Sequence, residues 1–306
     1  MTEAELVYEH FEHPLLTQRG LQMQILRADL VHPLLSGNKA FKLHYPLQVA
    51  SQTGKRQLLS FGGAWSNHLF SLAAAGQIFG FETLGLLRGE EPLQPNPVLL
   101  AMRQMGMKTQ WLDRQTYRLR HDPAFLAELQ MRYPDALLIP EGGAGLDGAR
   151  GAAQMLRGLP PSIDLLACAV GTGTTLAGLI SAASAHCHVL GLAVLKGADY
   201  LRPEIQGLLQ ALGRAQERES AATPAKAHWQ LETRFHGGGY AKVPIELAAF
   251  VRTFSCPTLP LEPVYTGKAF WGLWQMIERG ELPPGTREIC FVHTGGIYEP
   301  GSPLPF

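Results

Sequence analysis

The apolar segment Leu165–Val170 leads directly into the run Gly171-Thr172-Gly173-Thr174-Thr175. A strand, a Gly/Thr loop and a helix in this order bring backbone N–H groups, hydroxyls and the positive end of a helix dipole to one point, which suits a phosphate. The loop lacks both the Lys-Ser/Thr pair of a P-loop and the third glycine of the dinucleotide fingerprint. It therefore indicates a phosphate without naming the ligand, and a glycine-rich turn that binds nothing is the alternative.

Lys39 ends the run Ser36-Gly37-Asn38-Lys39, ahead of the amphipathic stretch AFKLHYPLQVA. A solvated lysine at the start of a helix is the simple interpretation. The alternative is an amine in a cleft, whose pKa is lowered by desolvation and which forms a Schiff base with a carbonyl compound. A Schiff-base lysine and a site for one phosphate are together what pyridoxal phosphate (PLP) requires.

Other polar side chains could serve the same ligand. Ser66 and Asn67 follow the strand-like run Leu58–Phe61 and either cap a helix or bind a carboxylate and a cofactor hydroxyl. Tyr265 is either a core tyrosine or a group that reaches the site. The hydroxyls of Thr266 and Thr294 could each approach a pyridine nitrogen. The histidines show no spacing that supports a metal site.

The elements that would position these residues recur as one unit: a short apolar strand, a glycine-rich loop and a helix. The strands of this unit are predicted at Leu58–Phe61, Leu137–Pro140, Leu165–Val170 and Ile289–His293. Strands that alternate with helices predict an α/β fold with a largely parallel sheet, and its ligands bind at the carboxyl ends of the strands. Residues 214–227 are predicted to form an exposed connection, and residues 257–260 and 282–285 to form turns.

Composition limits the class of protein further. The 306 residues suffice for two lobes, and equal numbers of Lys+Arg and Asp+Glu, 26 each, give no net charge to attract a nucleic acid or a membrane surface. The N-terminus has no signal-peptide pattern, and no apolar run approaches the ~18 residues of a spanning helix. The four cysteines are scattered, so we expect a cytoplasmic protein without structural disulfides.

Taken in order, the motifs SGNK, GG-x-x-SNH, EGGAGLDGARG, GTGTT-x-AGL, PVYTGKA and HTGG resemble those of fold type II PLP enzymes. Within that class the chain is most similar to the D-cysteine desulfhydrase/1-aminocyclopropane-1-carboxylate (ACC) deaminase family, from about Arg27 to Gly296. The resemblance implies two doubly wound α/β domains of the tryptophan synthase β type, with the cofactor cleft between them. The large PLP-binding domain would comprise residues 1–41 and 152–306, and the small inserted domain residues 42–151. A homodimer is also expected from the family.

The resemblance also implies roles for individual residues. Lys39 would carry the Schiff base with PLP and act as the proton-transfer base, and Tyr265 would lie close to the reacting carbon. Ser66 would contact the substrate carboxylate, and Asn67 the cofactor 3′-oxygen. The remaining cofactor contacts would be made by the phosphate loop and two ring-nitrogen neighbours, namely Gly171, Thr172, Gly173, Thr174, Thr175, Thr266 and Thr294.

The two ring-side threonines bear on the choice of reaction. At these two motifs ACC deaminases have sequences similar to PVYEGK and HLGG, with a glutamate near the ring nitrogen. The carboxylate of that glutamate favours a protonated pyridinium and a strong electron sink. Neutral threonines at positions 266 and 294 favour β-elimination, in which a good leaving group departs soon after deprotonation. We therefore expect a small amino-acid substrate and a D-cysteine desulfhydrase-like reaction. ACC deamination, another PLP-dependent amino-acid reaction, a non-catalytic PLP-binding protein and a nucleotide-binding protein are the alternatives.

The chain also departs from the usual family pattern. Phe41 replaces an arginine, Trp65 a glutamine, Thr174 a glycine and Glu262 an aspartate. The family's DY-x-GPGY segment is reduced to FHGGGY at residues 235–240. Trp65 and the glycine-rich segment are expected to reshape the substrate side of the site, whereas the cofactor residues are retained.

Overall fold

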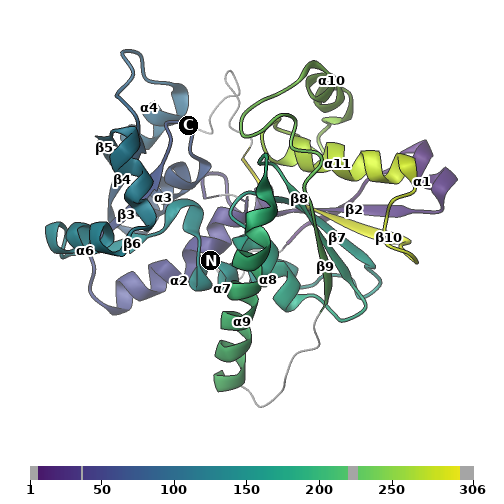
Figure 1. The fold of residues 1–306 in the computed structure, drawn as a ribbon, viewed down its shortest axis with the longest axis horizontal. Helices are drawn as coiled ribbons and strands as arrows, with labels where there is room; N and C mark the ends of the chain where they lie inside the picture. The colour runs from purple at the N-terminus through teal and green to yellow at the C-terminus, as the bar shows by residue number, and fades with distance from the viewer. Residues whose placement is uncertain (1–5, 36, 220–226, 297–306) are drawn as a thin grey trace.

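The computed structural model describes residues 6–35, 37–219 and 227–296, and two β-sheets lie side by side in it (Figure 1). The larger sheet has six strands in the order β1-β2-β10-β7-β8-β9, and the smaller has four in the order β5-β4-β3-β6. Within these two sheets, all strand pairings of the described residues are parallel except that of β1 with β2. The prediction of a largely parallel α/β fold is therefore confirmed.

The two sheets take their strands from different parts of the chain. The larger sheet contains β1 (Tyr8–His10), β2 (Gln22–Arg27), β7 (Leu165–Val170), β8 (His188–Ala193), β9 (His228–Glu232) and β10 (Glu288–His293). The smaller sheet contains β3 (Gln57–Gly62), β4 (Glu82–Arg88), β5 (Lys108–Leu112) and β6 (Ala136–Ile139). The smaller sheet is thus inserted between β2 and β7 of the larger one, and the four strands predicted from the glycine-rich units are present.

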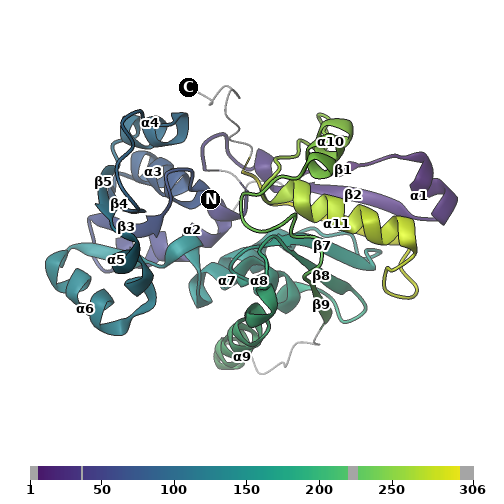
Figure 2. The same ribbon diagram turned by 45° about the horizontal axis from the view of Figure 1, so that its top comes forward.

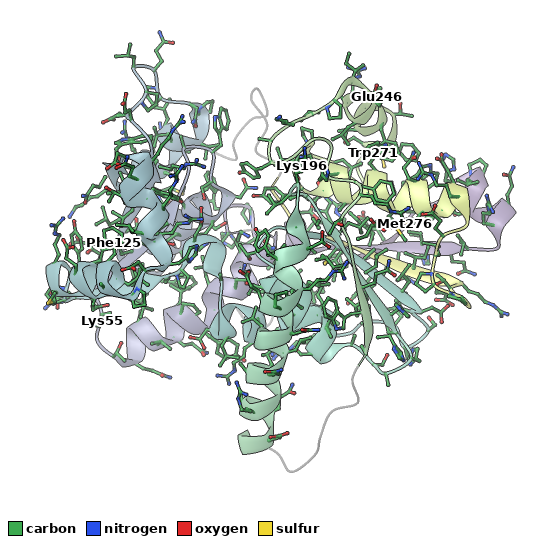
Figure 3. The ribbon with its side chains drawn as sticks, viewed as in Figure 1. Lys55, Phe125, Lys196, Glu246, Trp271 and Met276 are labelled. Carbon is green, nitrogen blue, oxygen red and sulfur yellow. The ribbon has the colours of Figure 1, made fainter. Side chains whose placement is uncertain are left out.

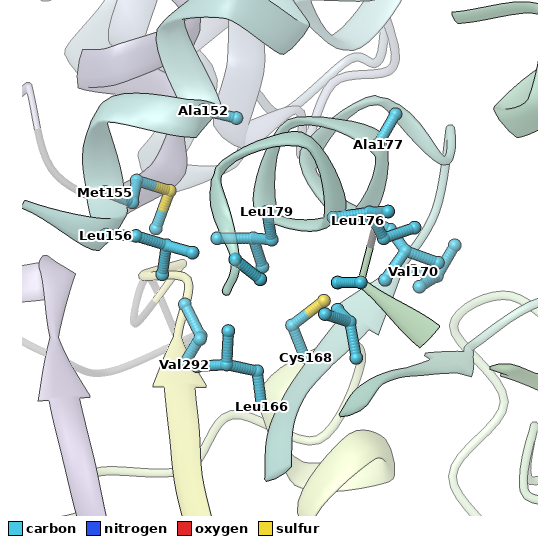
Figure 4. Packing of buried hydrophobic residues seen from close by; sticks show 14 of the residues in the cluster. Ala152, Met155, Leu156, Leu166, Cys168, Val170, Leu176, Ala177, Leu179 and Val292 are labelled. Carbon is cyan, nitrogen blue, oxygen red and sulfur yellow. The ribbon is translucent and has the colours of Figure 1, made fainter. Parts of the chain in front are cut away.

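Helices cover both faces of the larger sheet (Figure 2). On β7, Leu166, Cys168 and Val170 pack on one side, against α7 (Leu146–Ala153), α8 (Thr174–Ala182) and α9 (Leu201–Glu219) (Figure 4). Leu165 and Ala167 point to the other side, against α1 (Pro14–Arg19), α10 (Ile245–Phe254) and α11 (Thr266–Arg279). This alternation follows from the two-residue period of a strand, and a strand buried on both faces is continuously apolar.

The smaller sheet is covered in the same way. Helices α2 (Gly37–Gln52), α3 (Asn67–Phe79) and α4 (Pro97–Gln104) contribute to the core on one face. Tyr117 of α5 (Arg114–Arg118) and Leu129 of α6 (Pro123–Arg132) pack on the other face against Leu59 and Phe61 of β3. Within the described residues no helix combines the length and apolar character needed to cross a membrane.

Helices α2 and α7 pack against each other between the two sheets. A Cβ at Gly151 of α7 would lie only 1.9 Å from the Phe41 carbonyl oxygen, so the two backbones approach as closely as glycine allows. The Phe41 side chain packs against the cores of both lobes, which accounts for a large apolar residue there. The domain limits at residues 41/42 and 151/152, which fall in these two helices, remain a prediction.

Two sequence predictions need correction. Residues 214–219 are not part of a connection, because α9 continues to Glu219; the residues there, RAQERE, have good helix propensity. Residues 220–226 lie outside the described part of the chain. Lys39 lies within the first turn of α2 rather than before the helix, and Pro46 is accommodated inside it.

Each sheet has one topological switch point, where the strand order reverses direction. In the larger sheet it lies between β7 and β10, and in the smaller sheet between β3 and β6. The loops after these four strands are the glycine-rich loops of the sequence motifs. Ligands of open α/β sheets bind at the carboxyl ends of strands beside such points. The fold therefore places the four motifs that follow β3, β6, β7 and β10 at positions suited to bind a ligand.

Candidate active site

The loops of the two switch points face each other across the interface between the lobes. A Cβ at Gly142, after β6, would lie 3.3 Å from Thr172 Cγ2, after β7. A Cβ at Gly296, after β10, would lie 2.6 Å from the amide nitrogen of Asn67, at the start of α3. Glycine at both positions lets loops from the two lobes approach closely. The structure thus brings together segments that are more than 200 residues apart in the sequence.

The segment that carries Lys39 is tied to the larger sheet. The Asn38 N–H donates to the Thr294 carbonyl oxygen at 3.1 Å, and the Asn38 side-chain amide donates to Thr175 Oγ1 at 2.9 Å. Gly37 has φ +65°, and a Cβ there would lie 2.1 Å from the Thr294 carbonyl oxygen. Only glycine fits such a position. These contacts hold Lys39 beside the loop at residues 171–175 and the segment after β10.

Lys39 has the protonation behaviour expected of a nucleophilic amine. Its side chain is partly buried, and burial lowers its pKa to about 8. An ordinary lysine has a pKa near 10.4, so a much larger fraction of Lys39 is the free amine at neutral pH. Desolvation disfavours the ammonium form because the low-dielectric interior solvates a charge poorly. The amine that attacks a carbonyl carbon must be the unprotonated form.

Lys42 is a second site residue, which the sequence analysis missed. It is only 1% exposed, and no hydrogen bond or ion pair to Lys42 is present among the described residues. Burial and the charge of Lys39 lower its pKa well below the usual value. The i, i+3 spacing from Lys39, which places both lysines on one helix face, was the available signal. An unpaired buried ammonium is costly, so this position favours the binding of an anion.

The N-terminus of α8 is the second half of an anion site. Gly173, at φ +73°, precedes the helix, and no side chain of the described residues caps this end. The first N–H groups of a helix have no intrahelical acceptor, so they remain available for a ligand. Thr174 is the first helical residue, and its methyl group lies over Gly148, where a Cβ would be 3.2 Å away. The threonine that replaces the family glycine is thus accommodated without backbone strain.

These observations test whether the phosphate of PLP fits this chain. The uncapped amides of α8 and the buried Lys42 amine offer donors to an anion, and no acidic group of the described residues pairs with them. Lys39 lies one helical turn before Lys42 and supplies an amine for the carbonyl end of the same ligand. Donors for a phosphate and a nucleophile for an aldehyde are therefore present in one site, and the residues fit the cofactor.

Ser66 and Asn67 lie at the start of α3, in the small lobe. The Ser66 hydroxyl oxygen accepts a hydrogen bond from the Leu69 N–H at 3.2 Å and so caps the helix. Its own proton is not used in that bond and can be donated to a ligand. Trp65, immediately before it, is 46% exposed. The proposed contacts of Ser66 with a substrate carboxylate and of Asn67 with the cofactor oxygen remain predictions.

Tyr265 lies against the phosphate loop. A Cβ at Gly171 would be 3.4 Å from Tyr265 Cε1, and the Tyr240 ring approaches Tyr265 edge-on with centroids 6.1 Å apart. Burial, followed by the effect of Tyr240, raises the pKa of Tyr265 well above 10. The phenol therefore keeps its proton near neutral pH and acts as a hydrogen-bond donor. A phenolate base is excluded under those conditions.

The glycine-rich segment at residues 235–240 is fixed to α11. The Lys268 ammonium donates to the Gly239 carbonyl oxygen at 2.6 Å. Trp271 of α11 (labelled in Figure 3) packs edge-on against Phe235, with centroids 6.0 Å apart. Both contacts position Tyr240 beside Tyr265. The segment that differs from the family pattern therefore supplies an aromatic side chain near the loop at residues 171–175.

Glu262 holds the backbone around Tyr265 and Thr266 in place. Its carboxylate accepts hydrogen bonds from the backbone N–H groups of Val264, Tyr265 and Thr266 at 2.7, 2.7 and 2.6 Å. The Thr266 hydroxyl donates to the same carboxylate at 3.2 Å. Glu262 thus caps the N-terminus of α11, and it commits the Thr266 hydroxyl proton to an internal bond. The position of Thr266 beside a ring nitrogen remains a prediction.

Removal of this cap is expected to destabilise the protein. We expect Glu262→Ala to lower the free energy of unfolding by about 2–4 kcal/mol, because buried N–H groups lose a charged acceptor. Glu262→Asp, with one methylene fewer, keeps the carboxylate and should lose only part of that free energy of unfolding. Urea denaturation of both variants measures the effect. A Glu262→Ala protein as stable as the wild type would contradict the role of the carboxylate as a cap.

The strand that carries Thr294 is anchored by buried polar groups. His293, which has no exposed surface, lies 2.6 Å from the Pro260 carbonyl oxygen through Nε2 and 3.1 Å from Asp29 through Nδ1. Burial raises the pKa of Asp29, but its bonds to His293 and Arg27 outweigh burial and lower it. This network joins the carboxyl ends of β2 and β10 to the segment before Glu262. It therefore fixes the position of Thr294 relative to Glu262.

An α/β fold with a lysine of lowered pKa beside a helix N-terminus is the arrangement expected of an enzyme that holds a phosphorylated carbonyl compound. The model of the family described as pyridoxal-phosphate dependent enzyme matches residues 13–295, and the chain belongs to this family. The predicted cofactor, PLP, is thereby confirmed, as is the class of PLP-dependent enzyme. Fold and cofactor could be predicted from the order of the motifs, whereas the individual residue roles remain predictions.

Similar proteins carry two kinds of name. A putative ACC deaminase of Thermotoga maritima is 30% identical over 91% of this chain and 90% of its own length. A D-cysteine desulfhydrase of Yersinia pestis is 26% identical over 90% of this chain and 87% of its own length. A crystal structure of an ACC deaminase homologue matches with a TM-score of 0.82 and 28% identity, and the match covers 96% of this chain and 90% of that chain.

Proposed function

We propose that the protein is a PLP-dependent lyase that catalyses β-elimination on a D-amino acid of the D-cysteine type, giving pyruvate, ammonia and sulfide. The observation that carries this choice is the presence of threonines at positions 266 and 294. The nearby Glu262 carboxylate is engaged by three backbone N–H groups at the helix N-terminus, which offset its charge. In this proposal Thr266 and Thr294 would be neutral side chains where a strong electron sink would call for a free carboxylate.

The cofactor would be held at three points. The N–H groups at the start of α8 and the Lys42 ammonium would bind its phosphate, Lys39 its aldehyde carbon and Asn67 its ring oxygen. When bound, PLP supplies the electron sink that stabilises negative charge on the substrate α-carbon. Support comes from Lys42, which has no hydrogen-bond or ion-pair partner in the described part of the chain, and from the contacts that join Asn38 to Thr175 and Thr294.

The reaction would depend on the protonation states of the chain's own side chains. The free amine of Lys39 would take the α-proton, the bond from the β-carbon to sulfur would break, and the thiolate would leave. Tyr265 remains protonated and would donate a hydrogen bond on the reacting side. Ser66 and the first N–H groups of α3 would hold the substrate carboxylate. These groups orient the substrate so that its α-hydrogen faces Lys39.

A substrate panel tests the proposal. We expect pyruvate to form from D-cysteine and β-chloro-D-alanine, and more slowly or not at all from their enantiomers. ACC should yield little or no 2-oxobutyrate. Silence across both D-substrates and their enantiomers would contradict the elimination reaction.

The other outcomes separate the rivals. Rapid release of 2-oxobutyrate from ACC would instead establish ACC deamination, which the name of the Thermotoga relative favours. An imine absorbance without product from any substrate would indicate a protein that binds PLP but does not turn over. We also propose a cytoplasmic homodimer, on the family resemblance alone. Light scattering of the purified protein tests the dimer.

A further inference from the structure

Lys268 carries a buried charge that the proposed mechanism does not use. It lies in the first turn of α11 and is 1% exposed. Among the described residues its ammonium has one hydrogen-bond partner, the Gly239 carbonyl oxygen at 2.6 Å, and no ion-pair partner. Burial lowers the pKa of Lys268, and the Glu262 carboxylate opposes this effect. An ammonium has three donors and is costly to bury with a single acceptor, so stability alone does not account for a lysine at this position.

The acceptor of this bond lies in residues 237–241, a segment with an unusual backbone. Its three glycines have φ values of +60°, +92° and +125° in chain order, and Ala241, at +55°, is the only described residue other than glycine with a positive φ. The backbone is therefore strained at Ala241. In the part of the chain that the structure describes, every hydrogen bond of this segment stays within residues 236–242 except the one from Lys268. Lys268 thus makes the one hydrogen bond that ties the segment to α11.

The segment carries Tyr240 to the candidate site. Tyr240 is 55% exposed, and its ring approaches Tyr265 edge-on with centroids 6.1 Å apart. Tyr265 in turn lies against the phosphate loop, since a Cβ at Gly171 would be 3.4 Å from Tyr265 Cε1. A side chain that is more than half exposed has little packing to hold it, so the backbone of the segment decides whether Tyr240 stays beside Tyr265. A series of contacts thus leads from Lys268 through Tyr240 to Tyr265.

We propose that Lys268 is a positioning residue for the reaction: its bond to the Gly239 carbonyl oxygen fixes residues 237–241, and this segment holds Tyr240 against Tyr265. The proposal rests on the proposed function of Tyr265 as a hydrogen-bond donor on the reacting side. Without the bond, the backbone freedom of the glycines lets the segment move away from the site. Tyr265 then loses the neighbour that fixes its ring. A misplacement of about 1 Å in such a group costs up to roughly 100-fold in rate.

Lys268→Met separates a positioning role from a structural one. Methionine has a similar volume but no donor and no charge, so the urea midpoint of the holoenzyme should stay the same or rise. We expect kcat with D-cysteine to fall about tenfold and KM to change by less than about threefold. Lys196→Met is the matched control, because Lys196 is exposed, lies 3.6 Å from a Cβ at Gly239 and makes no hydrogen bond among the described residues. It should behave as the wild type. An unchanged kcat in Lys268→Met would overturn the proposal.

A double-mutant cycle with Tyr240→Ala tests the route of the effect. Tyr240→Ala alone should lower kcat at least as far as Lys268→Met does, since it removes the side chain that Lys268 positions. In the Tyr240→Ala background, Lys268→Met should lower kcat by a further factor of less than about two. Losses that multiply in the double variant would mean that the two residues act independently, and the proposal would then be wrong.

Limited digestion with trypsin follows the segment itself and requires no turnover. Lys242 is exposed and comes directly after residues 237–241. We expect cleavage after Lys242 in the Lys268→Met holoenzyme to be about tenfold faster than in the wild type, because the protease cuts where the chain opens. Cleavage after Lys55, in the small lobe, should be the same in both proteins. Equal cleavage after Lys242 would also overturn the proposal. Failure of every substrate in the panel would contradict β-elimination but leave the digestion result unaffected, so the two proposals fail separately.

Discussion

Lys39→Ala is expected to abolish the imine absorbance near ~420 nm and to lower turnover by at least roughly 10³-fold. The variant should still bind PLP, because the amides of α8 and Lys42 do not depend on the Lys39 amine. Lys39 is the amine whose pKa is lowered to about 8 by burial, and hydrogen bonds of the neighbouring Asn38 tie its segment to Thr175 and Thr294.

Three controls make this test specific. Borohydride reduction of the wild type followed by peptide mass spectrometry should attach the cofactor to Lys39. Lys55→Ala should behave as the wild type, since Lys55 lies at the far end of the small lobe (Figure 3). A small external amine should restore part of the lost activity in Lys39→Ala, which a misfolded protein would not allow. Persistence of the imine band in Lys39→Ala would refute the assignment of the lysine.

The sequence sufficed to predict that the motifs lie close together, because neighbouring parallel strands end at the same edge of a sheet. The loop at residues 171–175 and Thr294 follow the neighbouring strands β7 and β10, and strands that pair in parallel bring the loops at their carboxyl ends together. Asn67 follows β3 in the same way on the other lobe. A short apolar run between glycine-rich loops shows where each strand ends. The order of the motifs then identified the ligand.

The sequence could not reveal the partners of the site residues. Lys42 lies in a helix with a lysine's normal preference for solvent, and it is buried because Gly143, about 100 residues away, packs against it. Lys268 likewise donates to the backbone of Gly239, 29 residues earlier in the sequence. Such dependence on distant backbone groups leaves no periodic signal. The sequence also did not predict that Glu262 caps α11. Glu262 is followed by a proline and lies four residues before the first residue of the helix, so it does not match a common helix-capping motif.

Lys42→Met is expected to have opposite effects on the two states of the protein. Loss of the Lys42 amine should weaken PLP binding by about 2–5 kcal/mol, roughly 30- to 5000-fold in Kd, because the phosphate loses a desolvated partner. The same change should stabilise the apoprotein by about 1–4 kcal/mol, since methionine fills a similar volume without a charge to desolvate. Fluorescence titration with PLP and urea denaturation of the apoprotein measure the two effects.

The pH dependence of the stabilisation identifies its cause. The pKa of Lys42 is lowered in the folded state, so between that value and about 10.4 the unfolded chain binds a proton that the native state lacks. Stability of the wild-type apoprotein therefore rises with pH in that window, by up to about 1.4 kcal/mol per unit for this group. Lys42→Met removes this contribution, so the stability difference between the two proteins should shrink as the pH is raised towards 10. Lys42→Arg, which stays charged, should remain less stable than Lys42→Met at high pH.

A Lys42→Met apoprotein that is less stable than the wild type at pH 7, with unchanged affinity for PLP, would show that Lys42 is a packing residue and not the counter-charge of the phosphate.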